Sequence, residues 1–223
     1  MNGMIRVFGY LKKNWKGRIM IDPNYPNHSN YPTPEHDNWK EYYPHAEEDI
    51  PDKKDMPKPK GPVVRFTIWV DADHVHCMLT RRLVTGIILF LNNTPVKWVS
   101  KCQKTVETST YGSELVAAKQ AVELILDYRH MLRMMGANVE TTALMLGDNK
   151  SVVMNTTMPS SVLKKKHCAV NYHKVREACA TFLRFTQIDS EDNYADILTK
   201  PLGKDAFKRL AKSLIFRNPP TFS

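Results

Sequence analysis

A run of eight residues, 63–70, is mostly β-branched or aromatic and leads directly into Asp71-Ala72-Asp73. This composition is typical of a buried strand, because branched and aromatic side chains pack well on a pleated sheet. The chain is therefore expected to build a sheet whose first strand carries an acidic residue, Asp71, at its end.

The rest of the chain alternates between strand-like and helix-like segments. Two strands at hairpin spacing come first, followed by a long stretch of helical periodicity that Gly136 ends. The expected elements are strands at 63–70, 85–91 and 95–100, a helix at 110–135 with Thr110 as its N-cap, a strand at 142–146, helices at 149–156 and 168–183, a strand at 184–188, and helical residues at 194–199 and 204–214. This order predicts an α/β fold with a mixed five-stranded sheet flanked by helices, antiparallel strands first and crossovers later.

The first 62 residues differ from the rest in composition and in periodicity. Nine of the fourteen prolines lie there, and the stretch 22–62 has no sustained period of 2 or 3.6. It is expected to be an extended linker that is ordered where Tyr and Trp residues dock, preceded by a short helix within 2–15. The predicted organisation is an N-terminal segment at 1–62, a folded domain at 63–216 and a tail at 217–223.

Bulk properties exclude several classes of protein. No run of about 18 apolar residues exists, so neither a membrane-spanning helix nor a membrane partner is expected. The cysteines Cys77, Cys102, Cys168 and Cys179 form no CxxC pair, which argues against a zinc ribbon or a redox motif. The net charge of +9 lies mainly in residues 63–223 and suits a polyanionic partner such as nucleic acid, although an inert basic surface would look the same.

Four carboxylates occupy comparable places in the predicted fold. Asp71 and Asp148 follow expected strands. Glu114 lies near the start of the long helix, and Asp196 lies early in the last helical region. Because the ends of neighbouring strands converge in an open α/β sheet, these side chains are expected to meet. Taken singly, each also fits an ordinary role as a turn residue, a helix-start acid or a surface acid.

A group of carboxylates has a chemical requirement of its own. The charges repel and raise one another's pKa values unless a cation neutralises them. Mg²⁺ prefers oxygen ligands and leaves room for phosphate oxygens. Two such ions about 3.5–4 Å apart stabilise both the attacking and the leaving oxygen of phosphodiester hydrolysis. The pattern therefore predicts a metal-dependent site for phosphodiester cleavage.

Short motifs along residues 63–215 carry a resemblance to a known family. They are Val70-Asp71-Ala72-Asp73, Thr80-Arg81-Arg82, Thr85-Gly86, Trp98-Val99-Ser100-Lys101, Ser109-Thr110-Tyr111-Gly112-Ser113-Glu114-Leu115, Gly147-Asp148-Asn149-Lys150-Ser151, Lys166-His167, Tyr172-His173-Lys174-Val175-Arg176-Glu177 and Ala195-Asp196-Ile197-Leu198-Thr199-Lys200-Pro201-Leu202. In this order and at this spacing, the chain resembles the ribonuclease H domain of copia-type retrotransposon Pol polyproteins.

The resemblance implies a ribonuclease H-like fold and an endonuclease that hydrolyses the RNA strand of RNA–DNA hybrids during reverse transcription. By motif match it implies Asp71, Glu114 and Asp148 as catalytic metal ligands for two Mg²⁺ or Mn²⁺ ions, with Asp196 as the fourth. It also implies polymerase and integrase parts as partners within a polyprotein, with residues 1–62 as the end of the polymerase and a connecting segment. The expected location is the cytoplasm, in a retroelement particle, or the nucleus.

Ten residues are predicted to contact the hybrid, because sequence-independent binding needs groups that reach phosphates and sugars. They are Arg81, Arg82, Ser100, Lys101, Gln103, Asn149, Lys164, Lys165, Lys166 and His167. The run of three lysines also fits a solvated loop before a helix.

Two features depart from the family pattern. Many cellular ribonucleases H place a histidine shortly before the last aspartate, but residues 184–195 contain none. No polymerase, integrase or zinc-knuckle motif is present, so a fragment, a processed product or a truncated copy is expected. The alternative function is therefore a catalytically inactive remnant that binds nucleic acid. An integrase-like transferase is disfavoured, because its last carboxylate would be a helical glutamate rather than Asp196.

Overall fold

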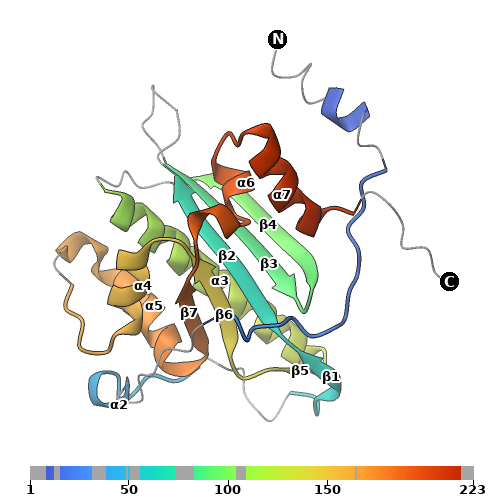
Figure 1. Ribbon diagram of the computed structural model, residues 1–223. Coiled ribbons are helices and arrows are strands. Elements are labelled where there is room, and N and C mark those ends of the chain that lie inside the picture. The colour runs from blue at the N-terminus through green and yellow to red at the C-terminus, as the bar shows by residue number, and fades with distance from the viewer. Residues whose placement is uncertain are drawn as a thin grey trace.

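The central sheet of the computed structural model has five strands in the spatial order β4-β3-β2-β6-β7 (Figure 1). They are β2 (Phe66–Asp73), β3 (Val84–Leu91), β4 (Thr94–Cys102), β6 (Ala143–Gly147) and β7 (Leu183–Gln187). Strand β3 pairs antiparallel with β2 and β4, whereas β6 pairs parallel with β2 and β7. The predicted α/β fold with a mixed five-stranded sheet is confirmed, including the antiparallel strands first and the crossovers later.

The structure describes residues 9–12, 16–31, 39–48, 50, 56–73, 83–103, 109–163 and 165–216. The tail at 217–223 and most of the expected N-terminal helix therefore lie outside the described residues. Within them, none of the helices is both long enough and apolar enough to cross a bilayer.

Helices cover both faces of the sheet (Figure 1). On one face lie α3 (Thr110–Met134), α4 (Lys150–Thr157) and α5 (Ala169–Thr181), and on the other lie α6 (Asp196–Thr199) and α7 (Lys204–Leu214). The remaining elements are the short helices α2 (Trp39–Tyr42), η1 (Lys166–Cys168) and η2 (Ser190–Asp192), and a separate pair of parallel strands, β1 (Lys60–Val64) and β5 (Ala137–Val139).

The two faces of β2 belong to two apolar clusters. Phe66, Ile68 and Val70 pack with α3 and α5, whereas Trp69 packs with Leu146 and the α6 side. Side chains alternate across a strand, so burial on both faces requires a continuous apolar run rather than an alternating one. That is why residues 66–70 are hydrophobic at every position except Thr67.

Most boundaries differ from the sequence-based expectation by one or two residues, and two further differences have a visible cause. The strand expected at 63–70 is interrupted at Arg65, whose backbone N–H donates to Asn92 Oδ1 and whose carbonyl accepts from the Asn92 N–H. This exchange with the β3–β4 turn separates β1 from β2. Helix α3 is capped by Ser109 instead of Thr110, because the Ser109 Oγ accepts the Gly112 N–H.

Parts of the N-terminal segment pack onto the domain. Residues 16–31 run beside the sheet from α7 (Figure 1), with Asp22 bonded to Thr94 and a 2.9 Å hydrogen bond between His28 Nε2 and Thr67 Oγ1. Strand β1 also begins before the expected boundary at residue 63. The folded unit therefore includes residues that the composition assigns to a linker.

Candidate functional site

The sheet brings Asp71 and Asp148 together. Strands β2 and β6 are parallel neighbours, and Trp69 pairs with Leu146. Two residues further along each strand, Asp71 and Asp148 emerge at the same edge, where strand ends form the ligand crevice of an open α/β sheet. The parallel pairing explains why residues 77 positions apart in the sequence become neighbours.

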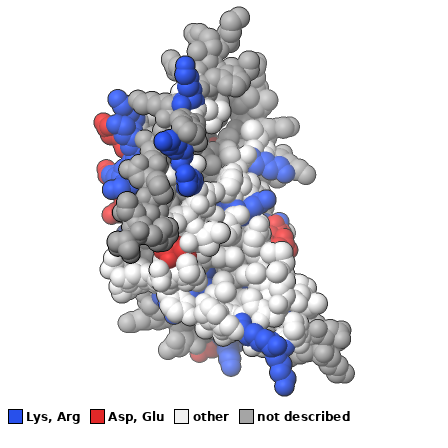
Figure 2. All heavy atoms as spheres, turned by 90° about the vertical axis from the view of Figure 1, so that its right-hand side faces the viewer, with Lys and Arg blue, Asp and Glu red and all other residues white. Residues whose placement is uncertain are grey.

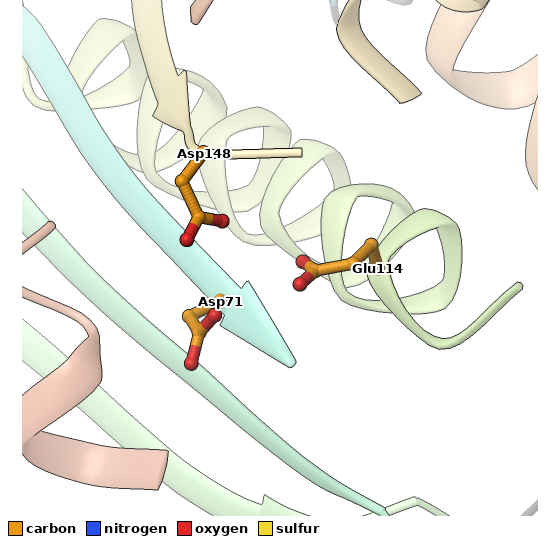
Figure 3. Close-up of side chains that lie close together, drawn as sticks. All are labelled: Asp71, Glu114 and Asp148. Atoms are coloured by element: carbon orange, nitrogen blue, oxygen red, sulfur yellow. The ribbon is translucent and has the colours of Figure 1, made fainter. Parts of the chain in front are cut away.

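Helix α3 adds the third carboxylate. Its N-terminus lies at the same edge, and Glu114 points from its first turns toward the two aspartates (Figure 3). One oxygen from each of Asp71, Glu114 and Asp148 lies within 4.8 Å of the others. Three of the four predicted carboxylates thus converge.

The electrostatics of this group are unfavourable without a cation. Burial raises the pKa of Glu114 to about 9, and the Asp71 and Asp148 charges add to the shift. Burial also raises the pKa of Asp71, despite the opposing hydrogen bond from Thr199 and the charge of Lys200. Both shifts show that the charged carboxylates are poorly compensated.

The fourth predicted carboxylate, Asp196, lies beside this group at the start of α6. Burial raises the pKa of Asp196 to about 6, although a hydrogen bond from Lys200 opposes the shift. Lys200 Nζ lies 2.8 Å from Asp196 Oδ1 and 3.3 Å from Asp71 Oδ1, so the lysine bridges the two aspartates. The Thr199 hydroxyl donates to Asp71 Oδ2.

Helix α6 reaches Asp71 because β3 carries no side chain where the helix crosses it. A Cβ at Gly86 would lie 2.6 Å from Thr199 Cγ2 and 2.8 Å from the Ala195 carbonyl oxygen. Gly86 is paired with Asp71 across the sheet. The glycine therefore allows the close approach that sets Thr199 and Lys200 against Asp71.

The donor set fits divalent cations. It consists of carboxylate oxygens, the ligands that Mg²⁺ and Mn²⁺ prefer, and it offers no sulfur or imidazole among the described residues. The raised pKa values indicate charge that a divalent ion would neutralise. Asp71, Glu114 and Asp148 could hold such an ion, with Asp196 adjacent.

Two predicted substrate residues lie near the end of β4, and one of them contacts α6. Ser100 pairs with Gly86, which pairs with Asp71, so the three residues lie level across β4, β3 and β2. The Ser100 hydroxyl donates to the Leu198 carbonyl. Lys101 follows Ser100, and both residues are exposed.

Gln103 requires a correction. Its side chain is buried, and its amide donates to Thr85 Oγ1 and to the Ser113 carbonyl. It ties the end of β4 to the start of α3, so it has a structural role and no access to a substrate. The sequence could not reveal this, because the burial depends on contacts with Thr85 and Ser113.

The other described candidates lie on the opposite side of the acids. Asn149 follows Asp148 and caps α4, accepting the Val152 N–H. Lys165 donates to Ser109 Oγ at the start of α3, at 2.6 Å. Lys166 and His167 are exposed in η1. Arg81, Arg82 and Lys164 lie outside the described residues.

Charge is unevenly distributed over the surface. In the view of Figure 2, the centre of the face is largely uncharged, and Lys and Arg side chains gather mainly toward its upper left. Phosphate binding requires positive groups. This uncharged centre is therefore a poor surface for a nucleic-acid backbone.

Sequence reasoning missed Thr199 and Lys200 as site residues. A signal was present, because they stand three and four residues after Asp196, which places them on its side of a helix. Their contact with Asp71 could not be inferred, since it depends on where α6 crosses β3.

Comparison with curated proteins gives relatives of one kind. The chain is 27% identical over 164 residues to the retrovirus-related Pol polyprotein from transposon RE1 of Arabidopsis thaliana, which is 73% of this chain and 11% of that protein. It is 27% identical over 148 residues to the corresponding polyprotein from transposon TNT 1-94 of Nicotiana tabacum, 66% of this chain and 11% of the relative. The chain thus spans about a ninth of the length of these relatives. The resemblance to retrotransposon Pol polyproteins is confirmed.

Solved structures that resemble the chain are ribonucleases H. The N-terminal ribonuclease H domain of rv2228c from Mycobacterium tuberculosis is 18% identical, with a TM-score of 0.47 over 67% of this chain and 98% of that one. LC11-RNase H1 in complex with an RNA/DNA hybrid is 17% identical, with a TM-score of 0.48 over 60% of this chain and 94% of that one. No protein-family model matches the chain.

Proposed function

We propose that this relative of plant transposon Pol polyproteins is a ribonuclease H that hydrolyses the RNA strand of RNA–DNA hybrids during reverse transcription. The observation that carries the proposal is the convergence of Asp71, Glu114 and Asp148 within 4.8 Å at one edge of the sheet. Such poorly compensated carboxylates are costly for folding, and function is a sufficient reason to retain them.

The proposed cofactors are two Mg²⁺ or Mn²⁺ ions held by these three residues, with Asp196 as a fourth ligand. When bound, the ions supply Lewis-acid activation of the scissile phosphodiester and of the attacking water. The chain itself holds the carboxylates in a fixed arrangement. Strands β2 and β6 hold Asp71 and Asp148 on rigid backbone, and the Thr199 hydroxyl orients Asp71.

The hybrid is proposed to lie across the acidic edge. Ser100 flanks the acids on the α6 side, Lys101 follows it on β4, and Asn149, Lys165 and Lys166 lie near the starts of α3 and α4. The exposed Ser100, Lys101 and Lys166 and the half-buried Asn149 and Lys165 carry hydroxyl, amide and ammonium groups, which suit sugar–phosphate backbones that are recognised by shape and charge. Because the relatives are Pol polyproteins, we also propose that polymerase and integrase parts of a longer polyprotein are partners of this chain. The proposed location is a cytoplasmic retroelement particle.

The test is cleavage of a hybrid, labelled on its RNA strand, by the purified chain with Mg²⁺, Mn²⁺ or a chelator. We expect RNA cleavage that requires the metal and falls by more than about 100-fold in Asp148→Asn, since a lost ligand costs more than a lost supporting contact. Asp127→Asn, which makes the same change at an exposed position of α3, should cleave like the unaltered chain.

Two outcomes would contradict the proposal. Full activity of Asp148→Asn would exclude the three-acid site as the catalytic centre. Hybrid binding without cleavage in either metal would instead support the inactive, nucleic-acid-binding remnant, for which the absence of a histidine from residues 184–195 is the specific observation.

A further inference from the structure

We propose that Lys200 is an internal counter-cation of the acidic site, which competes with divalent cations for Asp71 and Asp196 and thereby sets the affinity of the site for metal. The proposal rests on the proposed function only in requiring that the acids bind a divalent ion. It assigns Lys200 a positioning role, exerted through the two aspartates rather than on the substrate.

The first argument is geometric. Lys200 follows the last residue of α6, and its Nζ reaches inward to Asp196 Oδ1 at 2.8 Å and Asp71 Oδ1 at 3.3 Å. The Asp71 side chain is 1% exposed, whereas that of Lys200 is 29% exposed. The ammonium group therefore enters the site from the surface.

The second argument concerns the oxygen atoms of Asp71. Oδ2 accepts the Thr199 hydroxyl, and Oδ1 accepts the Lys200 ammonium. Both oxygens are therefore engaged within the protein. A divalent ion bound at Asp71 would lie close to Nζ, and the two cations would repel, so the Lys200 contact must lengthen for the ion to bind tightly.

The third argument concerns the other edge of the site. Among the described residues, Lys200 is the cation in hydrogen-bond contact with the acids, and it contacts Asp71 and Asp196. Glu114 and Asp148 form no ion pair with any residue that the structure describes. The compensation is thus one-sided, which leaves Glu114 and Asp148 as the open edge for an incoming ion.

The chain contains a matched control. Lys119 on α3 forms an i,i+4 ion pair with Glu123 at 2.5 Å, and its side chain is 28% exposed. Lys200 forms an i,i+4 ion pair with Asp196 and is equally exposed. Replacing either lysine by methionine removes the same charge and the same type of ion pair, but only one of the two changes is at the acidic site.

The experiment is isothermal titration of the full chain with MnCl₂ at fixed pH, with folding checked by circular dichroism. We expect Lys200→Met to bind Mn²⁺ at least about 5-fold more tightly, the lower end of measured coupling between sites. Lys119→Met should match the unaltered chain. Lys200→Arg keeps the charge and should return the affinity toward that of the unaltered chain, which separates charge from packing.

A second readout is the thermal unfolding of the same variants. Without metal, Lys200→Met should melt at a lower temperature, because the acids lose a counter-cation, and Mn²⁺ should close most of that gap. If Lys200→Met does not fold, Lys200→Gln keeps a donor for Asp196 without the charge and carries the same expectation.

Unchanged or weaker Mn²⁺ binding in Lys200→Met would overturn the proposal. Unchanged metal binding combined with weaker hybrid binding would show that Lys200 contacts the phosphate backbone instead. Tighter Mn²⁺ binding in a chain that cleaves no hybrid would support the role of Lys200 and contradict only the proposed nuclease.

Discussion

Two regions of this molecule bury carboxylates in opposite ways. At the acidic edge, Asp71, Glu114 and Asp148 share one partial counter-charge, and burial raises the pKa of Glu114 to about 9. Near the other end of α3, Glu48 forms ion pairs with two arginines. Its Oε1 lies 2.7 Å from Arg129 Nε and 2.6 Å from Arg133 Nη1.

In the second region the carboxylate charge is fully compensated by the two arginines. Burial alone would raise the pKa of Glu48, but hydrogen bonds from Arg129 and Arg133 outweigh it and lower the pKa below its ordinary value. Arg129 is fully buried and also donates to the Glu140 and Thr141 carbonyls. The difference teaches that a buried charge by itself does not mark a functional site, whereas an unmatched group of like charges does.

Removing the charge of Glu48 should have the largest effect on stability. Glu48→Gln leaves Arg129 buried without its carboxylate, so we expect a loss of about 3–5 kcal/mol in the free energy of unfolding, measured by urea denaturation. Glu47→Gln, the same change at the exposed neighbour, should be close to neutral. A loss below about 1 kcal/mol would show that residues 39–48 are not an integral part of the domain.

Packing offers a way to disturb the acidic region alone. Gly86→Ala forces α6 away from β3, because the new Cβ would lie 2.8 Å from the Ala195 carbonyl oxygen. We expect a loss of about 1–3 kcal/mol in stability and weaker hybrid cleavage, since Thr199 and Lys200 move with α6.

Gly203→Ala is the control for this change, because its Cβ would meet no atom within 4 Å. Its stability and its cleavage rate should stay near those of the unaltered chain. Unimpaired cleavage in Gly86→Ala would mean that the position of α6 does not matter for the acids.

A smaller effect is expected from pH, which should change the contribution of the acidic edge to stability. The folded pKa of Glu114, about 9, lies above its ordinary value of 4.5, so the unfolded chain ionises this group first. Stability without metal should therefore fall as the pH rises from about 4.5 to 9.

Glu114→Gln removes that penalty and should raise the melting temperature of the metal-free chain at pH 8 by roughly 2–4 °C, equivalent to about 1 kcal/mol. At pH 4 the variant and the unaltered chain should melt together. A variant that is less stable at pH 8 would indicate that the Glu114 charge is compensated after all.

The sequence by itself determined most of the secondary structure and three of the converging acids. The apolar run before Asp71, the helical period from residue 110 and the short strand before Asp148 each follow from local patterning. The sequence did not predict β5 or α2, and other differences, such as the Arg65 break and the Ser109 cap, depend on hydrogen bonds of single residues.

Only the tertiary structure decided which side chains meet. Gln103 is polar and looks available in the sequence, yet it is buried and donates to Thr85 of β3 and Ser113 of α3. Glu48 lies in a stretch without periodicity, and its partners are 81 and 85 residues away. The bridge from Lys200 to Asp71 depends on the passage of α6 over Gly86. Local patterning sets which face of an element is apolar, but contacts between distant segments depend on how those elements pack.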